Sequence, residues 1–141
     1  NSKSDIVALD AKTPSATPHT IAAQNAAFVG LSKDGSSLVY LDDPGTGFDP
    51  PLFVASLTTG GAPLQLSAEA SHVTLANDVV YWQQFESATK TTTLKAARLA
   101  NPSSILTIDV NLDPFTDVVV AGQKLFVGSK LGLWEYAALT P

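Results

Sequence analysis

The chain has 141 residues, of which 45% are hydrophobic and 15% charged, a composition typical of a folded globular domain rather than a disordered chain. Its formal net charge of −5 and its lack of a lysine and arginine cluster argue against nucleic-acid binding. The sequence has no cysteine, which excludes disulfides, thiolate metal sites and a cysteine nucleophile. It also has no run of about 18 apolar residues that would predict a membrane span.

Taken in chain order, short runs rich in Val, Leu, Ile, Phe and Tyr alternate with turn residues, which predicts an all-β chain. Two strands come first, at Asp5–Asp10 and Thr17–Ala22. A first full unit has four strands, at Ala26–Leu31, Ser37–Asp42, Leu52–Leu57 and Pro63–Ser67. A second has four, at His72–Ala76, Val79–Gln84, Thr92–Leu99 and Ser104–Asp109. A third has three, at Asp117–Ala121, Lys124–Ser129 and Gly132–Leu139.

The same order of strands and turns returns about every 45 residues. The dipeptides Asp34-Gly35, Asn77-Asp78 and Gly122-Gln123 occupy the same place in successive units and are typical of hairpin turns. Four short antiparallel strands per unit of this length predict the blade of a β-propeller. The chain is therefore predicted to be an incomplete propeller of about three blades: a half blade at 5–22, blades at 26–67 and 72–109, and an incomplete blade at 117–139. A β-sandwich is the alternative fold.

Two stretches carry a family resemblance. The run from Ser32 to Tyr40, which contains Asp34-Gly35, resembles the Ser-Pro-Asp-Gly turn and following strand of WD40-like repeats, although Lys33 replaces the usual proline. Val80-Tyr81-Trp82 is similar to the Tyr-Trp blades of six-bladed extracellular propellers. Such repeats occur in periplasmic Tol-type and in prolyl-peptidase propellers, so the resemblance implies an exported protein, periplasmic or extracellular. It implies little about activity, because propellers support many functions.

The predicted row of blades is too short to close into a ring. Closed propellers have roughly four to eight blades, and a single blade cannot bury its faces alone. We therefore expect the remaining blades to come from a second chain, or from a second copy that completes about six. The sequence contains no methionine, so we also expect the chain to be a processed or excised part of a longer protein.

Acidic and amide side chains gather in the predicted loops that join the second strand to the third and one blade to the next. The candidate ligand-binding residues are Asp42, Asp43, Asp49, Gln84, Glu86 and Asp113. Such a face could bind calcium through oxygen ligands or bind a basic partner. Alternatively, these residues are solvated loop carboxylates that begin turns. The spacing does not match an EF-hand loop, so we expect no metal site or cofactor beyond a weak calcium possibility.

The sequence does not point to catalysis. His19 and His72 have no nucleophile and orienting group at a recognisable spacing, and no Gly-x-Ser-x-Gly elbow is present. The aromatic residues Trp82, Phe85, Trp134 and Tyr136 could form a stacking surface for a glycan or a peptide, or could pack between blades. The first hypothesis is a non-enzymatic binding or scaffold module that engages a protein or a glycan. The alternative is a fragment of the propeller that gates a prolyl-peptidase-type hydrolase.

Overall fold

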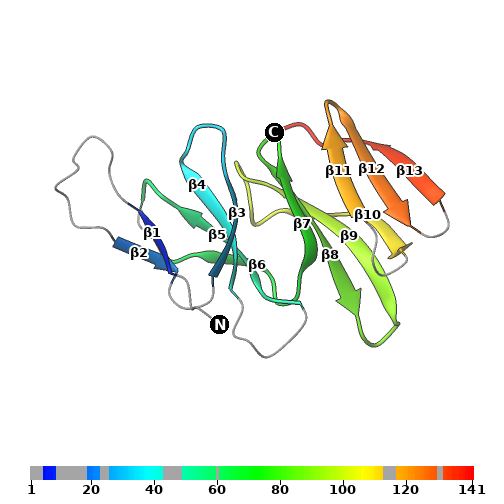
Figure 1. Ribbon diagram of the computed structural model, residues 1–141, viewed down its shortest axis with the longest axis horizontal. Helices are drawn as coiled ribbons and strands as arrows, with labels where there is room; N and C mark the ends of the chain where they lie inside the picture. Colours follow the sequence, from blue (N-terminus) through cyan, green and yellow to red (C-terminus); the bar gives the residue numbers. More distant parts are fainter. Residues whose placement is uncertain are drawn as a thin grey trace.

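The computed structural model describes residues 5–8, 19–22, 26–42, 49–59, 61–112, 117–129 and 132–141. Within these residues the chain is all-β, with four antiparallel sheets side by side in an open row (Figure 1). This arrangement is consistent with the predicted incomplete propeller. No helix in the described part of the chain is long and apolar enough to cross a membrane.

Each sheet is a meander in chain order. The first sheet has β1 (Ile6–Ala8) and β2 (His19–Ala22). The second has β3 (Ala26–Leu31), β4 (Ser37–Asp42), β5 (Leu52–Ser56) and β6 (Leu64–Ser67). The third has β7 (Ser71–Ala76), β8 (Val79–Glu86), β9 (Thr91–Arg98) and β10 (Ile105–Leu112). The fourth has β11 (Asp117–Ala121), β12 (Lys124–Ser129) and β13 (Gly132–Ala137).

Within the described residues the strands predicted from the sequence are present, with some ends displaced, whereas residues 9–10 and 17–18 of the first two predicted strands lie outside the described residues. β8 continues two residues further than predicted, to Glu86, β10 continues three further, to Leu112, and β13 ends two residues earlier, at Ala137. β8 is longer because Val79 to Glu86 pair without interruption with Arg98 to Thr91. The tight turn that follows, in which the Lys90 amide donates to the Glu86 carbonyl at 2.8 Å, lets this pairing reach the end of the hairpin.

The central strand β8 is buried on both faces. Its residues Val79, Val80, Tyr81 and Trp82 are all fully buried. Because alternate residues of a strand point to opposite faces, Val80 and Trp82 pack toward the second sheet, whereas Val79 and Tyr81 pack toward the fourth. The continuous apolar run is therefore the signature of a sheet covered on both sides.

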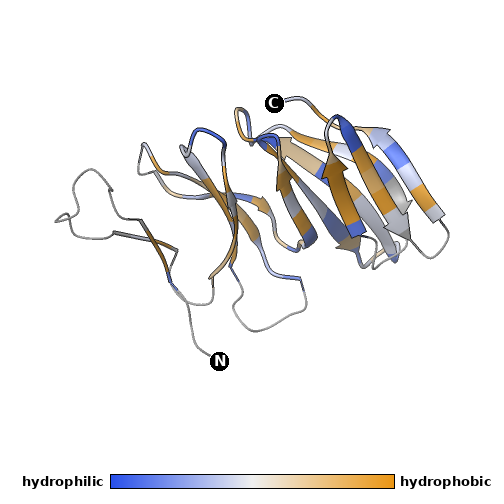
Figure 2. Cartoon of the chain, turned by 45° about the horizontal axis from the view of Figure 1, so that its top comes forward, coloured by the Kyte–Doolittle hydropathy of each residue, from blue (hydrophilic) through white to orange (hydrophobic). Residues whose placement is uncertain are grey.

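The second sheet repeats this arrangement one step earlier in the row. Leu38 and Tyr40 of β4 face the first sheet and pack near Ile6 and Ile21, whereas Val39 lies in the cluster shared with the third sheet. Tyr40 also stacks on Phe53 of the neighbouring strand, with ring centroids 5.5 Å apart. The core consists of three apolar layers, each between two adjacent sheets (Figure 2).

The first strands of the last three sheets lie next to one another. β3 approaches β7 so closely that a Cβ on Gly30 would meet Cδ2 of Leu75 at 2.8 Å. β7 in turn contacts β11, where the Thr74 hydroxyl donates to the Val118 carbonyl at 3.2 Å. The sheets therefore converge along their first strands, which is the radial order of propeller blades.

Truncation of the largest buried side chain tests this layered packing. We expect Trp82→Ala to lower the free energy of unfolding by about 3–5 kcal/mol, because it removes an indole that fills the layer between the second and third sheets. Urea unfolding followed by far-UV circular dichroism measures the loss. Thr59→Ala, at an exposed side chain in the turn after β5, is the control and should change the free energy by no more than about 0.5 kcal/mol. Equal losses for both variants would contradict the assignment of the core.

Candidate functional site

The acidic residues predicted as a site are only partly within the described chain. Asp42 ends β4, where its amide donates to the Pro51 carbonyl at 3.0 Å, and Asp49 precedes β5. Asp43 and Asp113 lie outside the described residues. The described part of the chain contains no group of three or more His, Cys, Asp or Glu side chains that could hold a metal ion.

Gln84 and Glu86 take part in a polar network between the second and third sheets. The Ser67 hydroxyl and the Lys95 ammonium both donate to Gln84 Oε1, at 3.1 and 3.0 Å. Gln84 Nε2 donates to Glu86 Oε1 at 2.9 Å, and this carboxylate lies 3.6 Å from Lys95 Nζ. The two predicted residues are thus engaged with neighbouring side chains that close the edge of the layer between these sheets.

Among the other residues considered from the sequence, Trp82 has a buried Nε1 without a hydrogen-bond partner among the described residues, and His72 has a positive φ of 49°. Trp82 is buried between the second and third sheets, and Trp134 is 39% exposed on β13. Exposed His72 lies with Nδ1 3.8 Å from a carboxylate oxygen of Asp117, across the contact of β7 with β11. The side chain of His19 is outside the described set.

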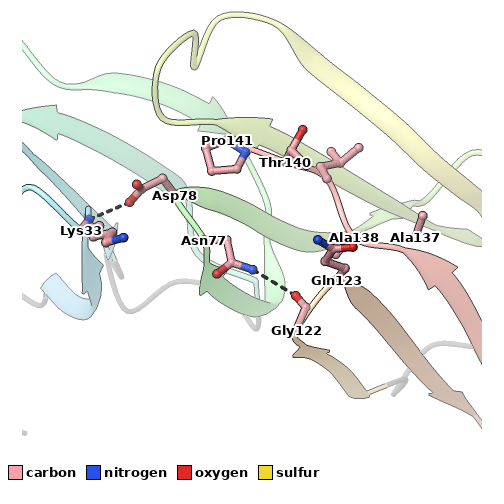
Figure 3. A pocket seen from close by; sticks show the side chains of 10 residues that line it. Lys33, Asn77, Asp78, Gly122, Gln123, Ala137, Ala138, Thr140 and Pro141 are labelled. Carbon is pink, nitrogen blue, oxygen red and sulfur yellow. Dashed lines mark hydrogen bonds between the residues drawn. The ribbon is translucent and has the colours of Figure 1, made fainter.

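A more regular polar feature lies at the turns that join the first and second strands of the second, third and fourth sheets. The Lys33 amide donates to Asp78 Oδ1 at 2.6 Å, and Asn77 Nδ2 donates to the Gly122 carbonyl at 3.2 Å (Figure 3). Each bond links the turn of one sheet to the turn of the next, and each spans 45 residues. We call this series of linked turns the turn ladder.

Each turn of the ladder is also bound to the end of the third strand in its own sheet. The Leu57 amide donates to the Ser36 carbonyl, the Leu99 amide to the Asp78 carbonyl and the Ala138 amide to the Gln123 carbonyl, at 2.8 to 2.9 Å. The same backbone hydrogen bond, from the end of the third strand to the first turn, is therefore present in the second, third and fourth sheets. Asn77 and Asp78 have positive φ values of 51° and 55°, as a two-residue hairpin turn requires.

A hollow of about 520 Å³ opens beside the turn ladder (Figure 3). It is lined by Lys33, Asn77, Asp78, Gly122, Gln123 and residues 137–141. A smaller hollow of about 310 Å³ shares Lys33, Asn77 and Asp78 with it and continues along β3 and β7. The described residues of the predicted site line neither of these hollows, since Asp42 and Glu86 are at the other ends of β4 and β8 from the turn ladder.

Sequence reasoning identified all three turns but not the contacts between them. The signal was available only for Asn77 and Gly122, which hold the same place in successive turns; Lys33 and Asp78 do not, because the bonds from Leu57 and Leu99 make Ser36 the counterpart of Asp78. Equal positions in successive units are brought together only if the units stack, which the sequence suggested but did not show at the level of single residues.

The Asp34 carboxylate stabilises the first turn of the ladder. It accepts hydrogen bonds from the Ser32 hydroxyl, the Ser36 amide and the Ser36 hydroxyl at 2.6 to 2.9 Å. These donors, the Ser32 hydroxyl first, lower the pKa of Asp34 from its usual value to about 2. Gly35 follows with a φ of 72°, a conformation that favours glycine.

Tyrosine hydroxyls join the fourth sheet and its C-terminal residues to the third sheet. The Leu139 amide donates to Tyr81 Oη at 2.9 Å, and the Tyr136 hydroxyl donates to Asp109 on β10. Burial first, and then the Asp109 hydrogen bond, raise the pKa of Tyr136 to about 12. Burial also raises the pKa of Tyr81 and of Tyr40. All three tyrosines of the chain are therefore held in their neutral form.

Comparisons with known proteins do not assign the chain to a family. No protein-family model matches it, and no curated protein matches it significantly. The resemblance to WD40-like repeats consequently rests on the turn and strand residues named above.

The Asp34 turn gives a prediction for acid stability. Because the pKa of Asp34 is lower in the folded chain than in the unfolded one, its stabilisation is present above about pH 4 and is lost as the pH falls toward 2. Asp34→Ala should lower the melting temperature at pH 7. The difference in melting temperature between this variant and the natural chain should become smaller at pH 2. Glu69→Ala, at another exposed carboxylate, is the control. A pH-independent difference would contradict the role of the ionised carboxylate.

The tyrosines give a prediction for alkaline conditions. A raised pKa means that the neutral hydroxyl is favoured by folding, so this stabilisation is present below about pH 10 and is lost as the pH rises toward 12. Ultraviolet titration of the native chain should show little phenolate at pH 10, whereas the urea-unfolded chain should be about half ionised. Tyr136→Phe should remove the step near pH 12. A native titration centred on pH 10 would contradict these contacts.

Proposed function

We propose that this chain is a non-enzymatic protein-binding module, part of an exported propeller, which acts by packing its end sheets against further protein. The observation that carries the proposal is the contrast between the inner and outer faces of the row. Between sheets, apolar side chains such as Tyr81 and Leu94 are fully buried. At the two ends, large apolar side chains remain in solvent.

Both ends of the row are apolar. On the fourth sheet, Val119 is 56% and Leu133 is 70% exposed. At the other end, Val7 on β1 and Phe28 on β3 are 55% and 61% exposed. Val7, Val119 and Leu133 belong to the first and fourth sheets, which end the open row (Figure 1), and Phe28 belongs to the second sheet, next to the two-stranded first sheet. Grouped apolar exposure of this kind is typical of interaction surfaces, and a protein surface matches it better than a glycan does.

Affinity capture with matched surface variants tests the proposal. The natural chain, Leu133→Lys and Thr59→Lys are immobilised and exposed to an extract of the cells that produce the protein, and the retained proteins are identified by mass spectrometry. Thr59 is exposed in the turn after β5 and away from both end strands, so it controls for added charge. We expect the natural chain and Thr59→Lys to retain the same partner and Leu133→Lys to lose it.

Two results would overturn this proposal. One is an identical set of retained proteins for all three chains, which would show that the end face binds nothing. The other is binding to a glycan array that is equal for the natural chain and for Leu133→Lys, with no protein captured. In that case the loops or the hollow beside the turn ladder would be the functional surface.

A further inference from the structure

We infer that the partner of the end sheets is a second copy of this chain, bound head to tail, so that the outer face of the fourth sheet in one copy covers the N-terminal end of the other. The inference rests on the proposed function and names the partner for it. Two surfaces carry it: the exposed face of β11–β13, and the exposed apolar residues of β1 and β3.

The strand register defines the outer face of the fourth sheet. Val118, Leu125 and Val127 face the third sheet and are buried. The alternate residues therefore point outward, and pairing places Val119 opposite Phe126 and Gly128 opposite Leu133. Val119, Phe126 and Leu133 thus form one apolar surface at the end of the row, which we call the C-terminal end surface.

The corresponding face of the third sheet shows what such a surface binds. There, Val79, Tyr81, Leu94 and Ala96 form a layer with the fourth sheet and are fully buried. Phe126 of β12 lies 45 residues after Tyr81 of β8, each in the second strand of its sheet and on the face that points along the row. By the same pattern, the outer face of the fourth sheet would be covered by another sheet of this kind.

Lys124 and Glu135 of this surface form an ion pair, whereas Asp117, at the start of β11, has a side chain that is 90% exposed. Lys124 Nζ and Glu135 Oε1 lie 2.9 Å apart on neighbouring strands, so these two charges neutralise each other. An incoming sheet therefore does not have to bury either of these charges without its partner.

The N-terminal end offers the complementary surface. Leu38 and Tyr40 of the second sheet are covered by the first sheet, which has only two strands. Phe28 pairs with Tyr40 and Leu31 pairs with Leu38, so both point to the same side, yet they remain 61% and 49% exposed. With Val7 of β1, they form the N-terminal end surface, which the short first sheet leaves uncovered.

The two surfaces cannot meet within one copy, because they lie at opposite ends of an open row (Figure 1). In a second copy, the C-terminal end surface of each chain meets the N-terminal end surface of the other. This contact is heterologous, and such contacts form a closed ring if the rotation per copy allows it and a filament if it does not. Each row has two complete four-stranded blades between a two-stranded and a three-stranded sheet, about three blades in all, so two rows give about six, within the range of roughly four to eight in closed propellers.

Cysteine cross-linking tests this arrangement, because the natural chain has no cysteine and each introduced thiol is unique. Val119→Cys and Phe28→Cys are prepared separately, mixed, and treated with a short bismaleimide, and Val7→Cys replaces Phe28→Cys in a second mixture. All three positions are more than half exposed, so the variants should fold, which circular dichroism checks. Thr59→Cys mixed with Val119→Cys is the control. Light scattering after size exclusion gives the mass of the untreated natural chain.

The expected result is a mass of twice 14.7 kDa and cross-linked pairs of position 119 with position 28 or 7, well above the pairs with position 59. A predominance of 119-to-119 pairs would overturn the head-to-tail order in favour of a symmetric contact. A 14.7 kDa species with no cross-linking above the control would overturn the second copy as partner, while capture of a different protein through Leu133 would still support the proposed function. A large, polydisperse mass would overturn ring closure.

Discussion

The structure depends on the burial of each middle sheet from both sides. A single strand such as β8 contributes Trp82 to one apolar layer and Tyr81 to the next. Both layers therefore depend on the same strand being in place. This makes the stability of a sheet a property of its neighbours as well as of its own hydrogen bonds. It also explains why the fourth sheet, which has a neighbour on one side only, leaves Val119 and Leu133 exposed.

Polar contacts organise the edges of these layers rather than their centres. Gln84 with Lys95 at one edge, and Lys33 with Asp78 at the other, fix how adjacent sheets align. Apolar contacts alone are tolerant of sliding, whereas hydrogen bonds of defined geometry are not. The combination gives a row in which the layers provide most of the free energy and the edges provide the register.

Much of this fold follows from local sequence. Runs such as Leu38-Val39-Tyr40 predict strands because β-branched and aromatic residues recur between turn dipeptides, and Asp34-Gly35 predicts the turn because glycine adopts a positive φ there. The extension of β8 to Glu86 was not predictable from Gln84-Phe85-Glu86, because it depends on pairing with Thr91 to Thr93. The contacts of the predicted site residues were harder to predict from the sequence than the fold was, because Lys95, which contacts Gln84 and Glu86, is on another strand.

The turn ladder has a consequence for how such a chain can change over evolutionary time. An insertion or loss of one whole unit by tandem duplication or deletion leaves each remaining turn beside another turn of the same kind, to which it can bond as Lys33 bonds to Asp78 and Asn77 to Gly122. A change that adds or removes part of a strand instead misaligns the layers beneath. Selection acting on gene length is therefore expected to proceed in whole-unit steps, with the number of units free to vary more readily than their size.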